Sequence, residues 1–355
     1  GLSRTYDGFA VQGLESGRNK STLGNWWRET AGSRDLASMV QKSAQNFDLV
    51  HAHHKLSILA AAQTGFPFFA TVRDYWPICP CGRSIYRTDA ACSVYDFTRC
   101  SEEEHGVHGL LTPLAFPWFD SRMRLRRTLL GRATRIFCIS RYVRQQLLPF
   151  FPESQLVWMP NFAEDLPPAP TPELPERFAI YIGKLEPNKG AHLLPSLMQA
   201  SSTTIPLVIL GEGSLESALK REFADRGLDA IFLGYREAPE MLSILQRSEF
   251  LIFPSLWPEP LGRVLIEAAM KSKPAIAFGH PGGHHDILQN GINGILVENQ
   301  DQFGAAIARL ASDSDLRLQM GTAARKIYEE RFSPNAIVTN LLVEYQALHP
   351  SGVHS

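Results

Sequence analysis

Residues 258–270 read PEPLGRVLIEAAM and follow a strand-like apolar run at residues 249–255. After the second proline, apolar residues recur at the spacing of one buried helical face, so the stretch predicts a strand followed by a helix. The start of such a helix presents free backbone N–H groups that can hold a phosphate. Glu259 lies just before this helix, and Glu267 lies eight positions later, near the same helical face. Both carboxylates can therefore face one cleft, although a lone pair at this spacing is usually two solvated glutamates.

The same alternation of strands and helices extends through the chain. Predicted strands lie at 48–54, 66–72, 155–159, 178–182 and 207–210, and predicted helices at 34–46, 56–64, 143–150 and 193–200. This order is typical of the α/β class, with parallel sheets covered by helices on both faces. A proline-rich stretch at 166–176 predicts a semi-rigid linker, which separates an N-terminal domain (1–165) from a C-terminal domain (177–334). Ligands of such sheets bind beyond the carboxyl ends of the strands, so two such domains facing each other would enclose a cleft.

The composition is that of a soluble globular protein with room for two domains. The chain has 355 residues, 44% hydrophobic and 20% charged, with a formal net charge of −1. This charge gives no overall attraction to nucleic acid or to an anionic membrane. We found no run of eighteen apolar residues and no charged-then-apolar leader, and five cysteines suit a reducing compartment. We therefore expect a cytoplasmic protein.

A glycine-flanked loop with two lysines follows the strand predicted at 178–182. Lys184 and Lys189 lie between Gly183 and Gly190, and their ammonium groups could share one anion such as a diphosphate. Two solvated lysines are the alternative. The next strand ends in Gly211-Glu212-Gly213, but the third position of a dinucleotide fingerprint is Glu216, which argues against a nicotinamide dehydrogenase.

These motifs occur in the order in which they are found in the retaining glycosyltransferases of family 4, and the second half of the chain resembles that family. The matching segments are 183–190, 210–213, 253–255, 259–268 and 282–294, with looser matches at 48–53, 71–76, 139–142 and 160–162. The resemblance implies the GT-B fold, in which two Rossmann-like domains face each other across a cleft. It also implies that the final helix, within 335–355, crosses back to the first domain.

The resemblance further implies a nucleoside diphosphate sugar as donor. Lys184 and Lys189 would bind the diphosphate and stabilise the leaving nucleotide without a metal or other cofactor. Glu259 would hold the transferred sugar and Glu267 the ribose, while Tyr235 would lie near the base. The implied donor-binding set is Gly183, Lys184, Lys189, Gly211, Tyr235, Glu259, Leu261, Gly262, Arg263 and Glu267, with Arg73 and Asp74 on the acceptor and sugar side.

The predicted function is therefore retaining transfer of a hexosyl unit to a glycan, a lipid-linked acceptor or a small molecule, as in polysaccharide biosynthesis. Three departures from the family limit what the resemblance implies, and the last two keep open a non-catalytic nucleotide-sugar-binding subunit. Lys184 replaces the usual arginine, and Arg73 replaces the usual histidine before Asp74. We also did not find the family's opening strand and glycine-rich loop in residues 1–47, so we expect an incomplete or reduced first domain.

Two cation-related features have competing interpretations. Cys79, Cys81, Cys92 and Cys100 could hold zinc, but their spacing is not that of paired C-x2-C knuckles, which favours free thiols. A zinc-dependent nucleic-acid module is disfavoured by the near-neutral charge. Asp313-Ser314-Asp315 resembles a metal-binding motif but reads better as the N-cap of a helix at 316–330.

A basic helical stretch runs from Arg122 to Arg135, beside Trp118-Phe119. It could rest on an anionic membrane surface where lipid-linked acceptors reside, or it could be a solvated helix face. Cys138, on a predicted strand, is expected in the core.

Overall fold

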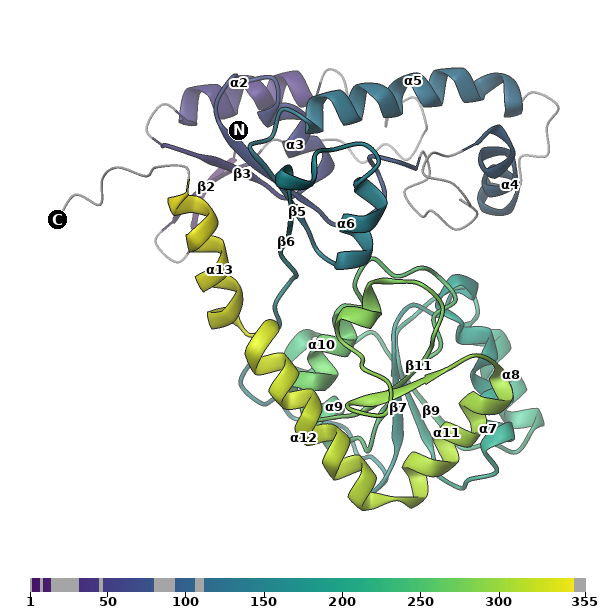
Figure 1. Cartoon of the computed structure of the whole chain (residues 1–355). Helices are drawn as coiled ribbons and strands as arrows, with labels where there is room; N and C mark the ends of the chain where they lie inside the picture. The colour runs from purple at the N-terminus through teal and green to yellow at the C-terminus, as the bar shows by residue number, and fades with distance from the viewer. Residues whose placement is uncertain are drawn as a thin grey trace. The chain divides into compact units, whose positions relative to one another are not determined.

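The computed structural model describes residues 2–6, 9–13, 32–44, 47–79, 93–105 and 112–347. The chain divides into two compact units. The first comprises Gly1–Cys138 with Arg144–Val157, and the second comprises Ile139–Val143 with Trp158–Ser355. A four-stranded and a six-stranded sheet are surrounded by helices (Figure 1). The predicted α/β class with two parallel sheets is confirmed.

The six-stranded sheet of the second unit has the order β12-β11-β10-β7-β8-β9. Its neighbouring strands pair in parallel. The chain starts at the centre with β7, adds two strands on one side, and then returns to β10 on the other side. The strands are β7 (Ala179–Ile182), β8 (Leu207–Leu210), β9 (Ala230–Gly234), β10 (Leu251–Phe253), β11 (Ala275–Phe278) and β12 (Gly294–Val297). The strand order therefore reverses between β7 and β10, where doubly wound sheets bind their ligands.

Helices cover both faces of this sheet (Figure 1). One face carries α7 (Leu194–Ser201), α8 (Glu216–Asp225) and α11 (Gln300–Ser312), and the other carries α9 (Ala238–Arg247), α10 (Arg263–Met270) and α12 (Ser314–Arg331). Alternate strand residues such as Ala179 and Tyr181 enter one core with Phe223 of α8 and Phe303 of α11. This is the period of two expected when successive strand side chains point to opposite faces. The chain continues into α13 (Pro334–Gln346), whose return to the first domain stays a prediction.

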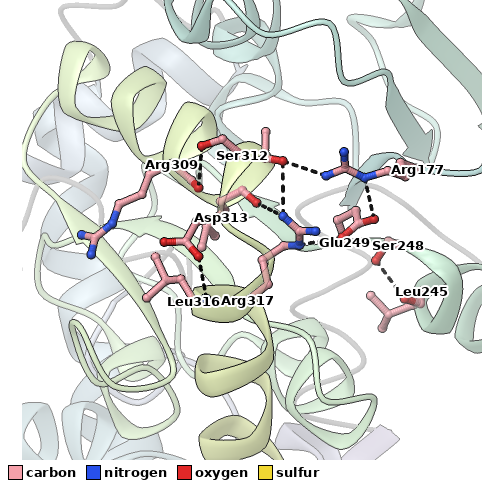
Figure 2. Close-up of polar contacts among 11 residues, drawn as sticks. Arg177, Leu245, Ser248, Glu249, Arg309, Ser312, Asp313, Leu316 and Arg317 are labelled. Carbon is pink, nitrogen blue, oxygen red and sulfur yellow. Dashed lines mark hydrogen bonds and ion pairs between the residues drawn. The ribbon is translucent and has the colours of Figure 1, made fainter.

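A charged cluster fixes the junction of α11 and α12 to Glu249, two residues before β10 (Figure 2). Glu249 accepts from Arg177 Nε at 3.1 Å and from Arg317 Nε at 2.6 Å. The same two arginines donate to the carbonyls of Leu310 and Ala311, near the end of α11. These carbonyls lie where a helix lacks its own partners, so the arginines cap α11. Asp313 accepts from Leu316 N–H at 2.9 Å, which confirms it as the predicted N-cap of α12.

The proline-rich stretch at 166–176 contains no helix or strand, but it is hydrogen-bonded to α9. The N–H of Ala169 donates to Ser243 Oγ at 2.9 Å, and Arg247 donates to Thr171 Oγ1 at 2.8 Å and to the Leu174 carbonyl at 3.5 Å. The stretch therefore belongs to the second unit and lies against α9 over much of its length.

The four-stranded sheet has the order β3-β4-β5-β6. Its strands are β3 (Val50–Ala52), β4 (Phe68–Val72), β5 (Arg135–Cys138) and β6 (Leu156–Trp158), and its helices are α2 (Ser33–Ala44), α3 (Lys55–Ala61), α4 (Val94–His105), α5 (Thr112–Leu130) and α6 (Arg141–Leu147). A separate antiparallel hairpin pairs β1 (Leu2–Tyr6) with β2 (Phe9–Gly13). Cys138 is completely buried, so its predicted core position is confirmed.

The basic helix predicted through Arg135 is wrong in its extent. α5 ends at Leu130, Arg132 lies in the following turn, and Arg135 opens β5. Arg126 is buried and donates to the Trp76 carbonyl at 3.3 Å, so it is no part of a solvated face. Among the helices that the structure describes, none combines the length and apolar character needed to cross a membrane.

Candidate functional site

Two adjoining pockets lie beyond the carboxyl ends of β7 and β10, at the reversal of strand order. The larger has a volume of about 600 Å³ and the smaller about 180 Å³. Ile182, Gly183 and Arg263 line both. The larger is also lined by Lys184, Leu210, Gly211, Glu212, Tyr235, Arg236, Ala238, Met241 and Glu267, and the smaller by Tyr181, Lys189, Phe253, Pro254, Ser255, Glu259, Gly262 and Val264. The structure thus brings together the predicted donor residues except Leu261, which is buried.

Close packing of three loops holds these pockets in place. Gly211 has φ +134°, and a Cβ added there would lie 1.9 Å from the Gly183 carbonyl oxygen. Gly190 has φ +67°, and its Cβ would lie 1.8 Å from the Pro254 oxygen. Only glycine fits positions that combine a left-handed backbone with such contacts. The glycines of these motifs therefore let the loops after β7, β8 and β10 approach one another.

The smaller pocket contains a partly buried ion pair. Lys189 Nζ lies 2.6 Å from Glu259 Oε1, and Ser255 Oγ donates to the same oxygen at 2.8 Å. The Lys189 ammonium also lies 4.5 Å from the centre of the Trp257 ring, a cation–π contact. The Glu259 side chain is only 6% exposed. Within the described part of the chain, no hydrogen bond or ion pair uses Glu259 Oε2, so this oxygen is available to a ligand hydroxyl.

The backbone around this pair is tightly connected. The N–H groups of Leu256 and Trp257 both donate to the Asn188 carbonyl at 3.1 Å, which joins the loop after β10 to the lysine loop. Gly283 N–H donates to the Glu259 carbonyl at 2.6 Å. A Cβ at Gly283 would lie 2.1 Å from the Pro260 carbonyl oxygen. The space left by the missing side chain of Gly283 is therefore filled by the backbone of Pro260, and not by a ligand.

A second carboxylate lies in the larger pocket. Glu267 Oε1 is 3.0 Å from Arg263 Nε, one helical turn away on α10. Burial raises the pKa of Glu267 above its ordinary value, although Arg263 acts in the opposite direction. Lys184 is exposed and makes no ion pair with the residues described. Tyr235 is 62% exposed, and its backbone N–H donates to Glu212 Oε1 at 3.3 Å.

Helical spacing does not set the relative direction of the two glutamates. α10 begins at Arg263, later than the sequence pattern predicted, and Glu259 lies in the preceding loop. The prediction that Glu259 and Glu267 are related by whole turns of one helix is therefore wrong. They line neighbouring pockets that meet at Gly183 and Arg263.

Arg73 and Asp74 belong to the first unit, where they follow the end of β4. Arg73 is exposed, and Asp74 Oδ1 accepts from the Trp76 N–H at 2.8 Å. Burial raises the pKa of Asp74. Their predicted role on the acceptor and sugar side stays a prediction.

Sequence reasoning gave no role to Ser255, Trp257, Arg236 or Met241, although each contacts the ion pair or lines a pocket. Ser255 was visible within a motif, but its bond to Glu259 depends on a turn that the sequence does not reveal. Of these four residues, Trp257 could have been noticed in the sequence, because it is a large aromatic residue between the predicted strand and the first proline of 258–270.

The histidines near the smaller pocket are engaged with backbone. His284 Nε2 lies 3.0 Å from the Phe278 carbonyl, and His285 Nε2 lies 3.0 Å from the His280 carbonyl. Across the residues described, no three His, Cys, Asp or Glu side chains are grouped so that they could hold a metal. Cys79 and Cys100 are buried, but Cys81 and Cys92 lie outside the described residues, so the zinc alternative is not tested.

Comparison with known protein families gives two adjacent matches. The model described as "Glycosyltransferase Family 4" matches residues 15–164, and the model described as "Glycosyl transferases group 1" matches residues 163–327. The boundary between the matches falls just before the proline-rich stretch.

Two similar curated proteins each match about half of this chain. O-antigen chain mannosyltransferase C of Escherichia coli is 27% identical over 177 residues, 49% of this chain and 47% of that protein. D-rhamnosyltransferase WbpZ of Pseudomonas aeruginosa is 32% identical over 165 residues, 45% of this chain and 43% of that protein. The chain thus matches about half the length of these relatives.

Among solved structures, Anabaena Alr3699/HepE in complex with UDP aligns with a TM-score of 0.64 at 17% identity. The alignment covers 88% of this chain and 82% of that one. At this level of identity the likeness shows a shared fold.

Proposed function

Because this chain belongs to the group 1, family 4 glycosyltransferases, we propose that it transfers a hexosyl unit from a nucleoside diphosphate sugar to a glycan, lipid-linked or small-molecule acceptor. The observation that carries the proposal is the pair of adjoining pockets at the strand-order reversal. The larger has room for a nucleoside, and the smaller holds Glu259 and Lys189. The names of the two transferases and the UDP bound to the Anabaena protein agree with such a donor.

In the proposed reaction, cations stabilise the leaving diphosphate. Lys184 approaches from the larger pocket and Lys189 from the smaller, so negative charge that develops on the leaving group meets two ammonium groups. We propose that these charges suffice without a metal ion, and that the anomeric configuration is retained, as the family implies. Glu259 Oε2 accepts from a sugar hydroxyl, and Glu267 accepts from the ribose.

Donor turnover tests this function. The full chain is incubated with UDP-, GDP- and ADP-sugars and a panel of acceptors, with and without a chelator, and released nucleoside diphosphate is measured. We expect one donor class to be turned over in the presence of chelator, and Glu259→Gln to reduce turnover at least about a hundredfold. Glu216→Gln is a matched control because Glu216 also pairs with a lysine, at 2.7 Å, but lies outside both pockets.

Two results would change the proposal. Tight donor binding without turnover on any acceptor would favour the non-catalytic nucleotide-sugar-binding subunit. Absence of binding to every donor class would contradict both functions.

We further propose that the acceptor is presented at the inner face of a membrane, where this cytoplasmic protein docks through α5. Leu114, Trp118 and Leu125 are 72%, 43% and 55% exposed, and their helical spacing places them in one stripe. Arg122, which stacks on Trp118 at 4.6 Å, and the exposed Arg124 flank the stripe. An apolar stripe between arginines suits an anionic lipid surface.

Vesicle co-sedimentation tests this docking. The chain is expected to bind vesicles containing anionic lipid, more weakly at high salt, and Leu125→Ser should reduce binding while leaving donor turnover on a soluble acceptor unchanged. Equal binding of Leu125→Ser and the unaltered chain, or no binding to anionic vesicles, would contradict it.

A further inference from the structure

Arg263 occupies the place where the two pockets meet. Ile182, Gly183 and Arg263 are the residues that line both pockets, and Arg263 alone among the three carries a charge. We propose that Arg263 binds the diphosphate of the donor through its guanidinium fork. This inference rests on the proposed function and assigns a specific group of the substrate to a residue beyond the two lysines.

The ion pair with Glu267 leaves much of the guanidinium available. Arg263 Nε contacts Glu267 Oε1 at 3.0 Å, and the arginine side chain is 62% exposed while the glutamate is 12% exposed. The contact with Glu267 is made through Nε, and neither terminal Nη group of Arg263 has a hydrogen bond among the described residues. A buried carboxylate thus fixes one edge of the group, and the outer edge stays open.

The geometry of a nucleoside diphosphate sugar directs its phosphates to this position. If the nucleoside occupies the larger pocket and the sugar the smaller, the diphosphate that joins them must cross the shared rim. Arginine can donate two parallel hydrogen bonds to one phosphate, whereas lysine acts as a point charge. Lys184 provides charge only, and Lys189 is already paired with Glu259. Arg263 therefore supplies the bidentate contact that the lysines cannot make.

The competing explanation is that Arg263 only orients Glu267. The two roles differ in how an Arg263 substitution depends on the ligand. Loss of orientation at Glu267 would weaken binding of nucleoside, monophosphate and diphosphate equally, because all three carry the ribose. Loss of a phosphate contact would leave the nucleoside nearly unaffected and weaken the diphosphate.

Isothermal titration of the full chain separates these roles. Nucleoside, nucleoside monophosphate and nucleoside diphosphate of the uridine, guanosine and adenosine series are titrated into the unaltered chain, Arg263→Met and Arg263→Lys. For the series that binds, we expect Arg263→Met to weaken diphosphate binding about tenfold or more and nucleoside binding less than twofold. Arg263→Lys keeps the charge and should recover only part of the loss.

Arg236→Met is the matched control. Arg236, in the loop before α9, makes a similar contact with Glu240, Nε to Oε1 at 3.0 Å and four residues along the chain, but it lines only the larger pocket. Its effect should not grow with the number of phosphates. An Arg263→Met effect that is equal for the three ligands, or absent, would overturn the inference and leave the proposed function standing. If the unaltered chain binds no diphosphate of any series, the proposed function fails and the inference with it.

Discussion

Replacing Lys189 with methionine tests the partly buried ion pair of the smaller pocket. Removing one partner of a buried pair typically costs about 3–5 kcal/mol, because the other charge stays buried. Here Lys189 is 25% exposed and Ser255 still donates to Glu259, so we expect a loss of about 2 kcal/mol. Because the cost comes from an uncompensated carboxylate, the second substitution Glu259→Gln should restore most of the lost stability.

Hydrogen exchange of the β7 and β10 amides measures this loss within the second unit. Lys220→Met is the control, because Lys220 pairs with Glu216 at 2.7 Å and lies 5.5 Å from the Phe232 ring centre. Its side chain is 52% exposed, so its replacement should cost at most about 0.5 kcal/mol. Equal losses in the two lysine variants, or no recovery with Glu259→Gln, would refute this account of the pair.

Three further perturbations have outcomes set by burial and backbone geometry. Burial lowers the pKa of His284 from 6.5 to about 3. The free energy of unfolding should therefore fall as the pH drops from 6.5 toward 3, by about 2 kcal/mol at pH 5. Urea unfolding should show a smaller pH dependence in His284→Gln. In Gly211→Ala the new Cβ would lie 1.9 Å from backbone, so we expect a loss of more than about 3 kcal/mol in the free energy of unfolding and no nucleotide binding. Gly227 also has a positive φ of +63° but has open space around it, so Gly227→Ala should cost about 1 kcal/mol in the same unfolding measurement. Arg317→Met should cost about 2 kcal/mol and Arg177→Met less than about 1, because their side chains are 12% and 54% exposed; similar losses in calorimetry would contradict this.

Local periodicity was sufficient to predict most of the elements that carry the site. The strands at β7 and β8 and the helices at α7 and α12 lie close to their predicted ranges. The two lysines and two glutamates of the site were readable because motif order placed Lys184, Lys189 and Glu259 in loops after strands and Glu267 in the helix that follows.

Features that depend on tertiary contacts could not be predicted. The sequence does not contain the strand order, so it did not show that β7 and β10 are neighbours. The pairing of Lys189 with Glu259 joins loops seventy positions apart, and the hydroxyl of Ser255 reaches the pair only because the loop folds back. The start of α10 was misplaced because Gly262, with φ +85°, interrupts an otherwise helical pattern.

The hydrogen bonds between the proline-rich stretch and α9 limit where residues can be inserted into this chain or deleted from it. A connector of this composition would ordinarily accept inserted residues at little cost. Here Ala169, Thr171 and Leu174 each meet a defined partner on Ser243 or Arg247, so one added residue between them would move at least one contact out of register. Insertions and deletions between residues 169 and 174 should therefore be as poorly tolerated as those in a short loop of the sheet.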